Sequence, residues 1–423
     1  MGSAESQKEV IMLEFYVRAT YTRARFRSGS VGPHIDGFAE RLRAAGYRDQ
    51  TGRMCIRHAV HLGTWADHQR IALASYDEGV IGRFVGHLQQ CRCPGCRPGR
   101  HRSAGAHAAM FLEYLRDQGA VKRLAPISKP EDPLVEMFCR WMVQHRGAAK
   151  ETLRAYRRVT ERLVSRIGSD PELYTVPVIR DAIAALSAGH GLATAEQAIT
   201  VTRMFLRCLA AEGLCRPGLD GAVPHVAPWR LTSLPRHISP EDVQKIIDAC
   251  DTAEVDGARD RAMILLMARL GLRAGDLVKL RLQDVDWDAA RLCVTGKGRS
   301  ETQLPLPQDA GDALLVYLTE HRPPTNSDRV FLTTLAPIRP LQNSATVSGL
   351  VRRAIERAGL ETPTTGAHLL RHSAAHALLR EGVSLPSIGA LLRHRILETT
   401  AVYAKVDVDT LRGVAQPWIG GAP

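Results

Sequence analysis

The sequence predicts a mainly helical protein with one small antiparallel sheet: two tandem helical domains followed by an α+β domain. Three observations support this fold class. Apolar residues recur at helical spacing over most of the chain. Two Pro- and Gly-rich stretches divide it into three segments. Short alternating runs separated by turn residues follow position 281. A chain of 423 residues is long enough for two or three domains.

The first two segments are expected to be helical domains covering residues 1–125 and 130–228. The linkers are LAPISKPEDP and RPGLDGAVPHVAPW. The two segments share a weak internal repeat, because AAMFLEYLRDQGAV resembles VTRMFLRCLAAEGL, with Met204 lying 94 residues after Met110. Duplication is one interpretation, and the general likeness of amphipathic helical domains is the other.

The third segment, residues 236–423, is expected to be the mixed domain. It opens on a helix capped by Ser239, with Pro240 at the first helical position. Residues 258–280 predict a helix, a Gly-containing turn and a second helix. Residues 282–307 then predict three strands with turns at Asp288 and Gly296, and further helices follow.

The charge of the chain favours a polyanionic partner. The net charge is +12 with a pI near 9.5, and Arg supplies most of the excess. Guanidinium groups bind phosphate in a bidentate manner, so nucleic acid is the first expectation, with affinity that falls steeply as salt rises. An Arg-rich proteome of high-GC origin would give the same composition.

The sequence also suggests where the protein works. No apolar run is long enough to span a membrane, and no signal-peptide core follows the start. Nine scattered cysteines suit a reducing cytosol better than a disulfide framework. We therefore expect a cytoplasmic protein without a membrane segment.

Six residues of the third segment form a candidate catalytic group. Two Arg can grip the non-bridging oxygens of a phosphate, a Lys or His can protonate a leaving alkoxide, and a Tyr hydroxyl can act as a nucleophile. In chain order the six are Arg273, Lys297, His368, Arg371, His394 and Tyr403. Each signal alone is weak, and their joint order makes the pattern specific.

These motifs resemble the tyrosine recombinase (phage integrase) family. The matching stretches are GLRAGD, TGKGRSETQLPL, HLLRHSAAHALL and LLRHRILETTAVYAKV, within residues 236–408. KETLRAYRRVTERLV resembles, more loosely, the helical core-binding domain of the family. The resemblance implies a tetramer on two DNA duplexes, a Holliday junction intermediate, and a reaction that needs neither metal nor ATP. The length and layout of the chain resemble those of recombinases carried by mobile elements, and partner recombinases are among the partners that the resemblance allows.

The resemblance also implies individual roles. Arg273 and Arg371 would clamp the scissile phosphate, and Lys297 would protonate the 5′ hydroxyl. His368 would assist proton transfer and His394 would hydrogen-bond a phosphate oxygen. Tyr403 would attack and form a 3′-phosphotyrosyl link, Asp276 would brace the site, and His372 would support it. The segment after Tyr403 would dock on a neighbouring protomer.

One position departs from the family pattern. The residue before His394 is usually Gly, but here it is Arg393. Because this position closes a helix, Gly would be the easy residue there. Arg393 is expected either to alter the turn or to add a phosphate contact.

Two histidine or cysteine patterns raise the question of a metal. His372 and His376 have the i, i+4 spacing of zinc ligands, but Ser373 replaces the Glu of the metalloprotease motif. In CRCPGCRPGRHR, Cys91, Cys93 and Cys96 with His87 or His101 can hold zinc, although the spacing is not that of a standard finger. We favour a basic loop without metal.

Further arginines are candidates for contacts with DNA phosphates. They are Arg92, Arg97, Arg100 and Arg102 in the basic loop, Arg154 and Arg157 in the second segment, and Arg393. The expected function is site-specific DNA recombination for integration, excision or transposition. A type IB topoisomerase and a non-catalytic DNA-binding protein are the alternatives.

Overall fold

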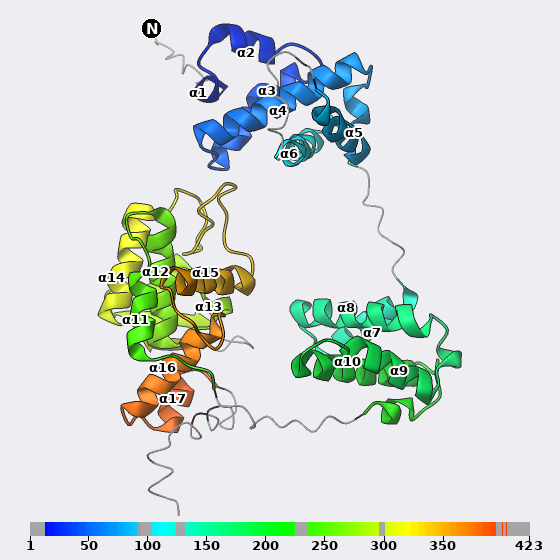
Figure 1. Cartoon of the computed structure of the whole chain (residues 1–423), viewed down its shortest axis with the longest axis vertical. Helices are drawn as coiled ribbons and strands as arrows, with labels where there is room; N and C mark the ends of the chain where they lie inside the picture. The colour runs from blue at the N-terminus through cyan, green and yellow to red at the C-terminus, as the bar shows by residue number, and fades with distance from the viewer. Residues whose placement is uncertain are drawn as a thin grey trace, which may run out of the picture. The chain divides into compact units, whose positions relative to one another are not determined.

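The computed structural model describes residues 13–91, 93, 103–123, 132–224, 235–295, 301–394, 400 and 403 (Figure 1). The chain is mostly helical with one small antiparallel sheet, so the predicted fold class is confirmed. It divides into two compact units. One is Leu124–Arg230, and the other combines Met1–Arg123 with Leu231–Pro423. The three-domain division stays a prediction.

The described N-terminal residues fold into six helices around an aromatic core. Phe38 and Phe111 pack edge to face with ring centroids 4.9 Å apart, and both are fully buried. Together with Phe84, these residues pack the two longest helices, Asp49–His68 and Ala104–Asp117, against each other. The helices are α1 Leu13–Tyr16, α2 Thr20–Phe26, α3 Gly32–Ala44, α4 Asp49–His68, α5 Glu78–Gln89 and α6 Ala104–Asp117.

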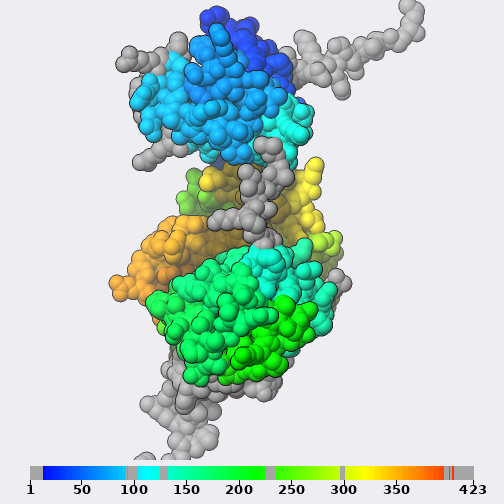
Figure 2. Space-filling model, turned by 90° about the vertical axis from the view of Figure 1, so that its right-hand side faces the viewer, coloured from blue at the N-terminus to red at the C-terminus, as the bar shows by residue number. Residues whose placement is uncertain are grey.

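The described residues of the unit Leu124–Arg230 form four α-helices with a core of their own. Phe138 and Phe205 meet edge to face at 5.6 Å at its centre. Figure 2 shows this unit in space-filling form, coloured cyan to green. Its helices are α7 Pro133–Arg146, α8 Lys150–Ile167, α9 Val176–Ser187 and α10 Leu192–Ala211.

The internal repeat recurs in the structure, element by element. In each copy a long helix leads to a single 3-10 turn and then to a buried tyrosine, Tyr76 or Tyr174, followed by a twelve-residue helix. The Met-Phe-Leu stretches that match in sequence lie on α6 and α10, where Phe111 and Phe205 fill the two cores. This correspondence favours duplication over a general likeness of helical domains.

The C-terminal residues form the mixed α+β part, in which helices surround α12. This helix is buried on nearly all sides, because apolar residues occupy most of its circumference. Ser239 caps the first helix by accepting the Asp242 N–H, as predicted. The helices are α11 Pro240–Asp248, α12 Val255–Leu270, α13 Ala274–Lys279, α14 Gln308–Val316, α15 Ser344–Arg357, α16 His368–Arg380 and α17 Leu385–Leu391.

The sheet has three antiparallel strands in sequential order, as predicted. They are β1 Val285–Asp286, β2 Arg291–Thr295 and β3 Glu301–Pro305. Leu292 and Leu304 pair across β2 and β3 and face the core. The hairpin tip that carries Lys297 lies outside the described residues. Of the described helices, none has the length and apolarity needed to cross a membrane.

Candidate active site

The turn between α12 and α13 positions the first arginine of the site. Gly271 ends α12 with φ +59°, a left-handed conformation that glycine adopts at no steric cost. A Cβ at this position would lie 2.4 Å from a methyl carbon of Leu392, so the close packing also requires glycine. The chain then enters α13, where the Asp276 carboxylate accepts the Arg273 N–H at 2.9 Å. Asp276 therefore fixes the backbone that carries Arg273.

Helix α16 supplies the second arginine. Arg371 is 4% exposed and donates to the carbonyl oxygens of Gly271 and Leu392. These two bonds hold the guanidinium between the ends of α12 and α17. No carboxylate pairs with Arg371 among the described residues. Burial, and next the charge of Arg273, lower the pKa of Arg371 to about 10, so it stays charged at neutral pH.

The end of α17 positions His394 through a Schellman motif. The Arg393 N–H donates to the Ala390 carbonyl at 3.0 Å, and the His394 N–H donates to the Gly389 carbonyl at 2.9 Å. Arg393 lies at the left-handed position with φ +55°. The turn expected for glycine therefore forms with arginine, at a cost of roughly 1 kcal/mol in backbone strain.

The Arg393 side chain forms an ion pair with Asp276. The two side chains are 7% and 11% exposed, and the carboxylate oxygen that accepts the Arg273 N–H also accepts from Arg393. Nε and Nη1 of Arg393 are buried without a hydrogen-bond partner in the described part of the chain. Asp276 neutralises Arg393, while the guanidinium groups of Arg273 and Arg371 pair with no carboxylate in the described part of the chain. The site is therefore positively charged and suited to an anion.

Tyr403 is buried in the same site. Its side chain is 2% exposed and packs against Ala375, Ile388 and Leu392. The hydroxyl lies 2.8 Å from Nδ1 of His372. Burial raises the pKa of Tyr403, although the charges of Arg371 and Arg273 oppose that shift, so the hydroxyl is protonated at neutral pH.

The two nearest imidazoles are neutral at pH 7. Burial, followed by the charge of Arg371, lowers the pKa of His394 to about 4. Its Nδ1 lies 2.7 Å from the Thr400 hydroxyl, and its ring stacks parallel to that of Tyr403 with centroids 6.4 Å apart. Burial likewise lowers the pKa of His372. A neutral His372 is free to accept a hydrogen bond from Tyr403 through Nδ1.

The structure thus brings together most of the catalytic candidates. Arg273, Arg371, His394 and Tyr403 meet at the ends of α12, α16 and α17, and Asp276 and His372 contact them directly. His368 lies one turn before His372, with ring centroids 6.3 Å apart. Burial, followed by the charges of Arg371 and Arg273, lowers the pKa of His368.

The remaining candidates lie elsewhere or are not described. Lys297, Arg92, Arg97, Arg100 and Arg102 fall outside the described residues. Arg154 is exposed and pairs with Glu151, and Arg157 pairs with Glu136 on α7. His376 stacks on His237 at 3.7 Å while His372 turns to Tyr403, so this helical pair points to different partners.

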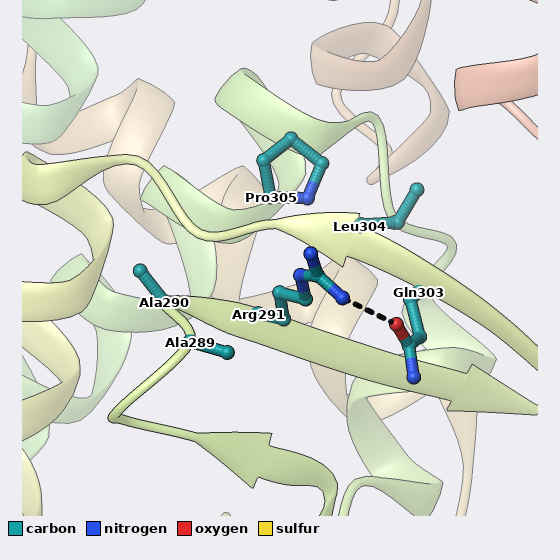
Figure 3. Close-up of a pocket in the computed structure, with 6 residues that line it drawn as sticks. All are labelled: Ala289, Ala290, Arg291, Gln303, Leu304 and Pro305. Carbon is teal, nitrogen blue, oxygen red and sulfur yellow. Dashed lines mark hydrogen bonds between the residues drawn. The ribbon is translucent and has the colours of Figure 1, made fainter.

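A hollow on the surface of the sheet is separate from the candidate active site. It has a volume of about 270 Å³ and lies on the sheet, where Arg291 donates to the Gln303 side chain at 3.1 Å (Figure 3). These two residues are diagonal neighbours on one face of β2 and β3. None of the catalytic candidates lines this hollow.

The Asp276–Arg393 ion pair predicts that substitutions at these two positions have strongly coupled effects on the free energy of unfolding. Asp276→Asn leaves Arg393 buried without an anion and is expected to cost about 3 kcal/mol. Arg393→Gly loses the ion pair but relieves the left-handed strain, so it is expected to cost less than about 1 kcal/mol. In the Arg393→Gly background, Asp276→Asn should cost at least about 1.5 kcal/mol less than in the wild type. Urea denaturation of the four proteins measures this coupling.

An exposed ion pair in the same part of the chain supplies the control. Asp309 accepts from Arg269 at the surface, and Asp309→Asn should change stability by no more than about 0.5 kcal/mol. Additive effects of Asp276→Asn and Arg393→Gly would mean that the two side chains do not depend on each other.

Comparisons with known proteins give the family. The phage integrase family model matches residues 236–409. The putative integrase/recombinase y4rA of Sinorhizobium fredii is 35% identical over 420 residues, covering 97% of this chain and 100% of that protein. Tyrosine recombinase XerD of Listeria innocua is 29% identical over 292 residues, covering 66% of this chain and 96% of that protein.

Solved structures agree in fold. The XerH site-specific recombinase in its post-cleavage complex with a palindromic difH substrate has a TM-score of 0.53 and 20% sequence identity. That match covers 80% of this chain and 94% of XerH. The resemblance inferred from the motifs is thereby confirmed, and the chain belongs to the phage integrase family, the tyrosine recombinases that cut and rejoin DNA at specific sites.

Proposed function

We propose that Tyr403 is the nucleophile with which this recombinase cuts DNA at the ends of a mobile element. The observation that carries the proposal is the position of the Tyr403 hydroxyl. It lies 2.8 Å from a neutral imidazole, near the buried guanidinium of Arg371 and the half-buried guanidinium of Arg273. The tyrosine oxygen bonds to phosphorus, and the bond from phosphorus to the 5′ oxygen breaks. The link formed is a 3′-phosphotyrosine, and a second strand's 5′ hydroxyl reverses the step.

Each charged group has a role in this step. Arg371 uses two of its five N–H donors on the Gly271 and Leu392 carbonyls, which leaves three for phosphate oxygens. Arg273 adds a second guanidinium whose only described side-chain bond is a long one, 3.4 Å, to the Arg393 carbonyl. Together they stabilise the charge that develops on the phosphate. Lys297 supplies the proton that the departing 5′ oxygen takes up.

His372 is proposed to receive the tyrosine proton. His368 was the residue that the sequence favoured for proton transfer, but His372 is the one that touches the hydroxyl. His394 and Thr400 hold the other side of the Tyr403 ring.

This assignment predicts a pH dependence for cleavage. Burial lowers the pKa of His372, so its neutral imidazole prevails at neutral pH and persists into more acidic solution than that of a free histidine. The cleavage rate is therefore expected to decline only in more acidic solution. His372→Gln should lower the rate by about 10² and remove that acidic limb. Single-turnover cleavage measured across pH tests this.

The histidine one turn further on provides a matched control. His376 stacks on His237, and His376→Gln should keep both the rate and the pH profile of the wild type. An unchanged acidic limb in His372→Gln would show that another group takes the proton.

Helix α8 is proposed to bind the DNA backbone. Arg154, Arg158, Arg162 and Arg166 are spaced by four residues and exposed, so they form a basic stripe along one side of the helix. Side chains of this kind contact phosphates and position a protein on the duplex without reading its sequence. Arg157 takes a different role, because it pairs with Glu136 and joins α8 to α7.

The assembly on DNA is also proposed by analogy. A lambda integrase tetramer bound to a Holliday junction matches this fold with a TM-score of 0.50. We propose that this chain likewise acts as a tetramer on two duplexes in the bacterial cytoplasm, in association with the nucleoid. Exchange of the C-terminal tail between protomers is part of the proposal, and that tail lies outside the described residues.

A plasmid assay separates the proposed reaction from its alternatives. Supercoiled plasmids carrying two, one or no copies of the native element's ends are incubated with the protein. Site-dependent recombinants from the plasmid with two ends are expected. Relaxation of the plasmid without ends would favour a topoisomerase, and binding without any strand cutting would favour an accessory protein.

A further inference from the structure

A second cluster of chemically reactive side chains lies in the N-terminal helices, apart from the candidate active site. It consists of His61 on α4, His87 on α5, and Cys91 and Cys93 just after α5. One nitrogen or sulfur atom from each residue lies within 4.8 Å of the other three. The recombination reaction described above uses none of these residues.

The spacing of these atoms fits a tetrahedral metal ion. With zinc bonds of about 2.3 Å to sulfur and about 2.0 Å to nitrogen, adjacent ligand atoms are separated by roughly 3.3–3.8 Å. Cys91 Sγ lies 3.5 Å from His61 Nε2, and Cys93 Sγ lies 3.5 Å from His87 Nε2. Two opposite edges of the tetrahedron are therefore already at the length that a bound zinc ion requires.

The surroundings are those of a closed structural site. Cys91 is 2% exposed, and its sulfur accepts the Cys93 N–H at 3.3 Å, a bond that stabilises a thiolate. Trp65 stacks on His87, and Phe84 meets His61 edge to face at 5.2 Å. Aromatic rings thus hold both imidazoles. Four protein ligands leave no position for water or substrate, so the site suits a structural rather than a catalytic ion.

We propose that His61, His87, Cys91 and Cys93 bind one zinc ion that stabilises the N-terminal helices. Without a metal, each of the two 3.5 Å contacts could be a separate thiol-to-imidazole hydrogen bond. They would not require both pairs to converge within 4.8 Å, as they do here. This arrangement favours the zinc alternative that the sequence argument ranked second, with His61 as a ligand that it did not consider.

The ion would have a specific mechanical role. It would tie the middle of α4, at His61, to the C-terminal end of α5, at His87. Zinc binding of this kind contributes directly to folding stability.

Metal analysis of the full chain, purified without a polyhistidine tag, tests the proposal. About one zinc per chain is expected after dialysis. Cobalt in its place should give the intense visible bands of a tetrahedral ion and the sulfur-to-cobalt charge-transfer band of thiolate ligands. His61→Gln and Cys93→Ser should each abolish zinc retention. EDTA should lower the Tm of the wild type and leave that of Cys93→Ser unchanged.

Two matched variants show whether the loss is specific. His68→Gln changes an exposed histidine on the same helix as His61, and Cys293→Ser changes a cysteine on β2. Both should retain one zinc. A wild-type chain with neither zinc nor thiolate–cobalt bands would overturn the proposal. So would a Cys96→Ser variant that loses zinc while Cys93→Ser retains it. The cobalt spectrum of the wild type decides the matter even if a variant fails to fold.

Discussion

Tyr403→Phe will abolish covalent attachment of the protein to DNA while leaving DNA binding nearly unchanged. The substitution removes one oxygen and keeps the ring that packs against Ile388 and Leu392. The lost hydroxyl is the group that faces His372 and, in the proposed reaction, the only atom that bonds to phosphorus. The measurement uses a nicked duplex carrying the native element's ends, run on a denaturing gel. The wild type should give a shifted, protease-sensitive band that the variant lacks.

A second buried tyrosine gives the matched control. Tyr317 is fully buried in the same part of the chain, and its hydroxyl accepts only the Leu332 N–H at 3.4 Å. Tyr317→Phe should still form the adduct. A band that persists in Tyr403→Phe would assign the nucleophile to another residue. If the wild type binds this DNA in a native gel but gives no covalent band, the result would favour an accessory DNA-binding protein over a catalytic recombinase.

Arg273→Ala is expected to slow cleavage by about 10³ with little loss of DNA affinity. Its guanidinium is half-buried, and burial lowers its pKa, so its charge acts on a bound phosphate with little screening. Removal of one such donor typically costs 10² to 10³ in rate. Many other phosphate contacts sustain binding. Single-turnover cleavage and native-gel affinity, measured on the same duplex, give both numbers.

Substitution of Arg273 tests catalysis with less disturbance of the fold than substitution of Arg371 would. Arg371 holds two backbone carbonyls, and its loss would leave these buried groups unpaired. Arg273 makes one long side-chain bond, so alanine should be tolerated structurally. Arg269→Ala, which breaks a surface ion pair with Asp309, should retain the wild-type rate. An equal fall in affinity and rate for Arg273→Ala would contradict the proposed division between binding and chemistry.

Features encoded by neighbouring residues were predicted well from the sequence. The Ser239 cap, the three strands and the turn before α13 each depend on residues within a few positions of one another. Local signals of this kind act through hydrogen bonds that the backbone forms with nearby side chains. For Asp276 it was the family resemblance that implied a brace, and in the structure its carboxylate accepts the backbone N–H of Arg273, three residues away.

Features that depend on distant residues were predicted less well. Arg393 forms an ion pair with Asp276, which lies 117 residues earlier in the chain. Tyr403 contacts His372, which lies 31 residues earlier. Neither leaves a local pattern, because such contacts depend on how α13, α16 and the end of α17 pack together. His61 was missed for the same reason, since it is one of three histidines on an amphipathic helix and lies 30 residues before Cys91.

The Arg393–Asp276 pair has a consequence for the order in which the two positions can be changed. Loss of the aspartate alone leaves a buried guanidinium without an anion, whereas replacement of the arginine by glycine leaves a carboxylate that still accepts the Arg273 N–H. A protein engineer who varies position 276 should therefore replace Arg393 first. The pair thus sets a mutational order between two residues that lie 117 positions apart.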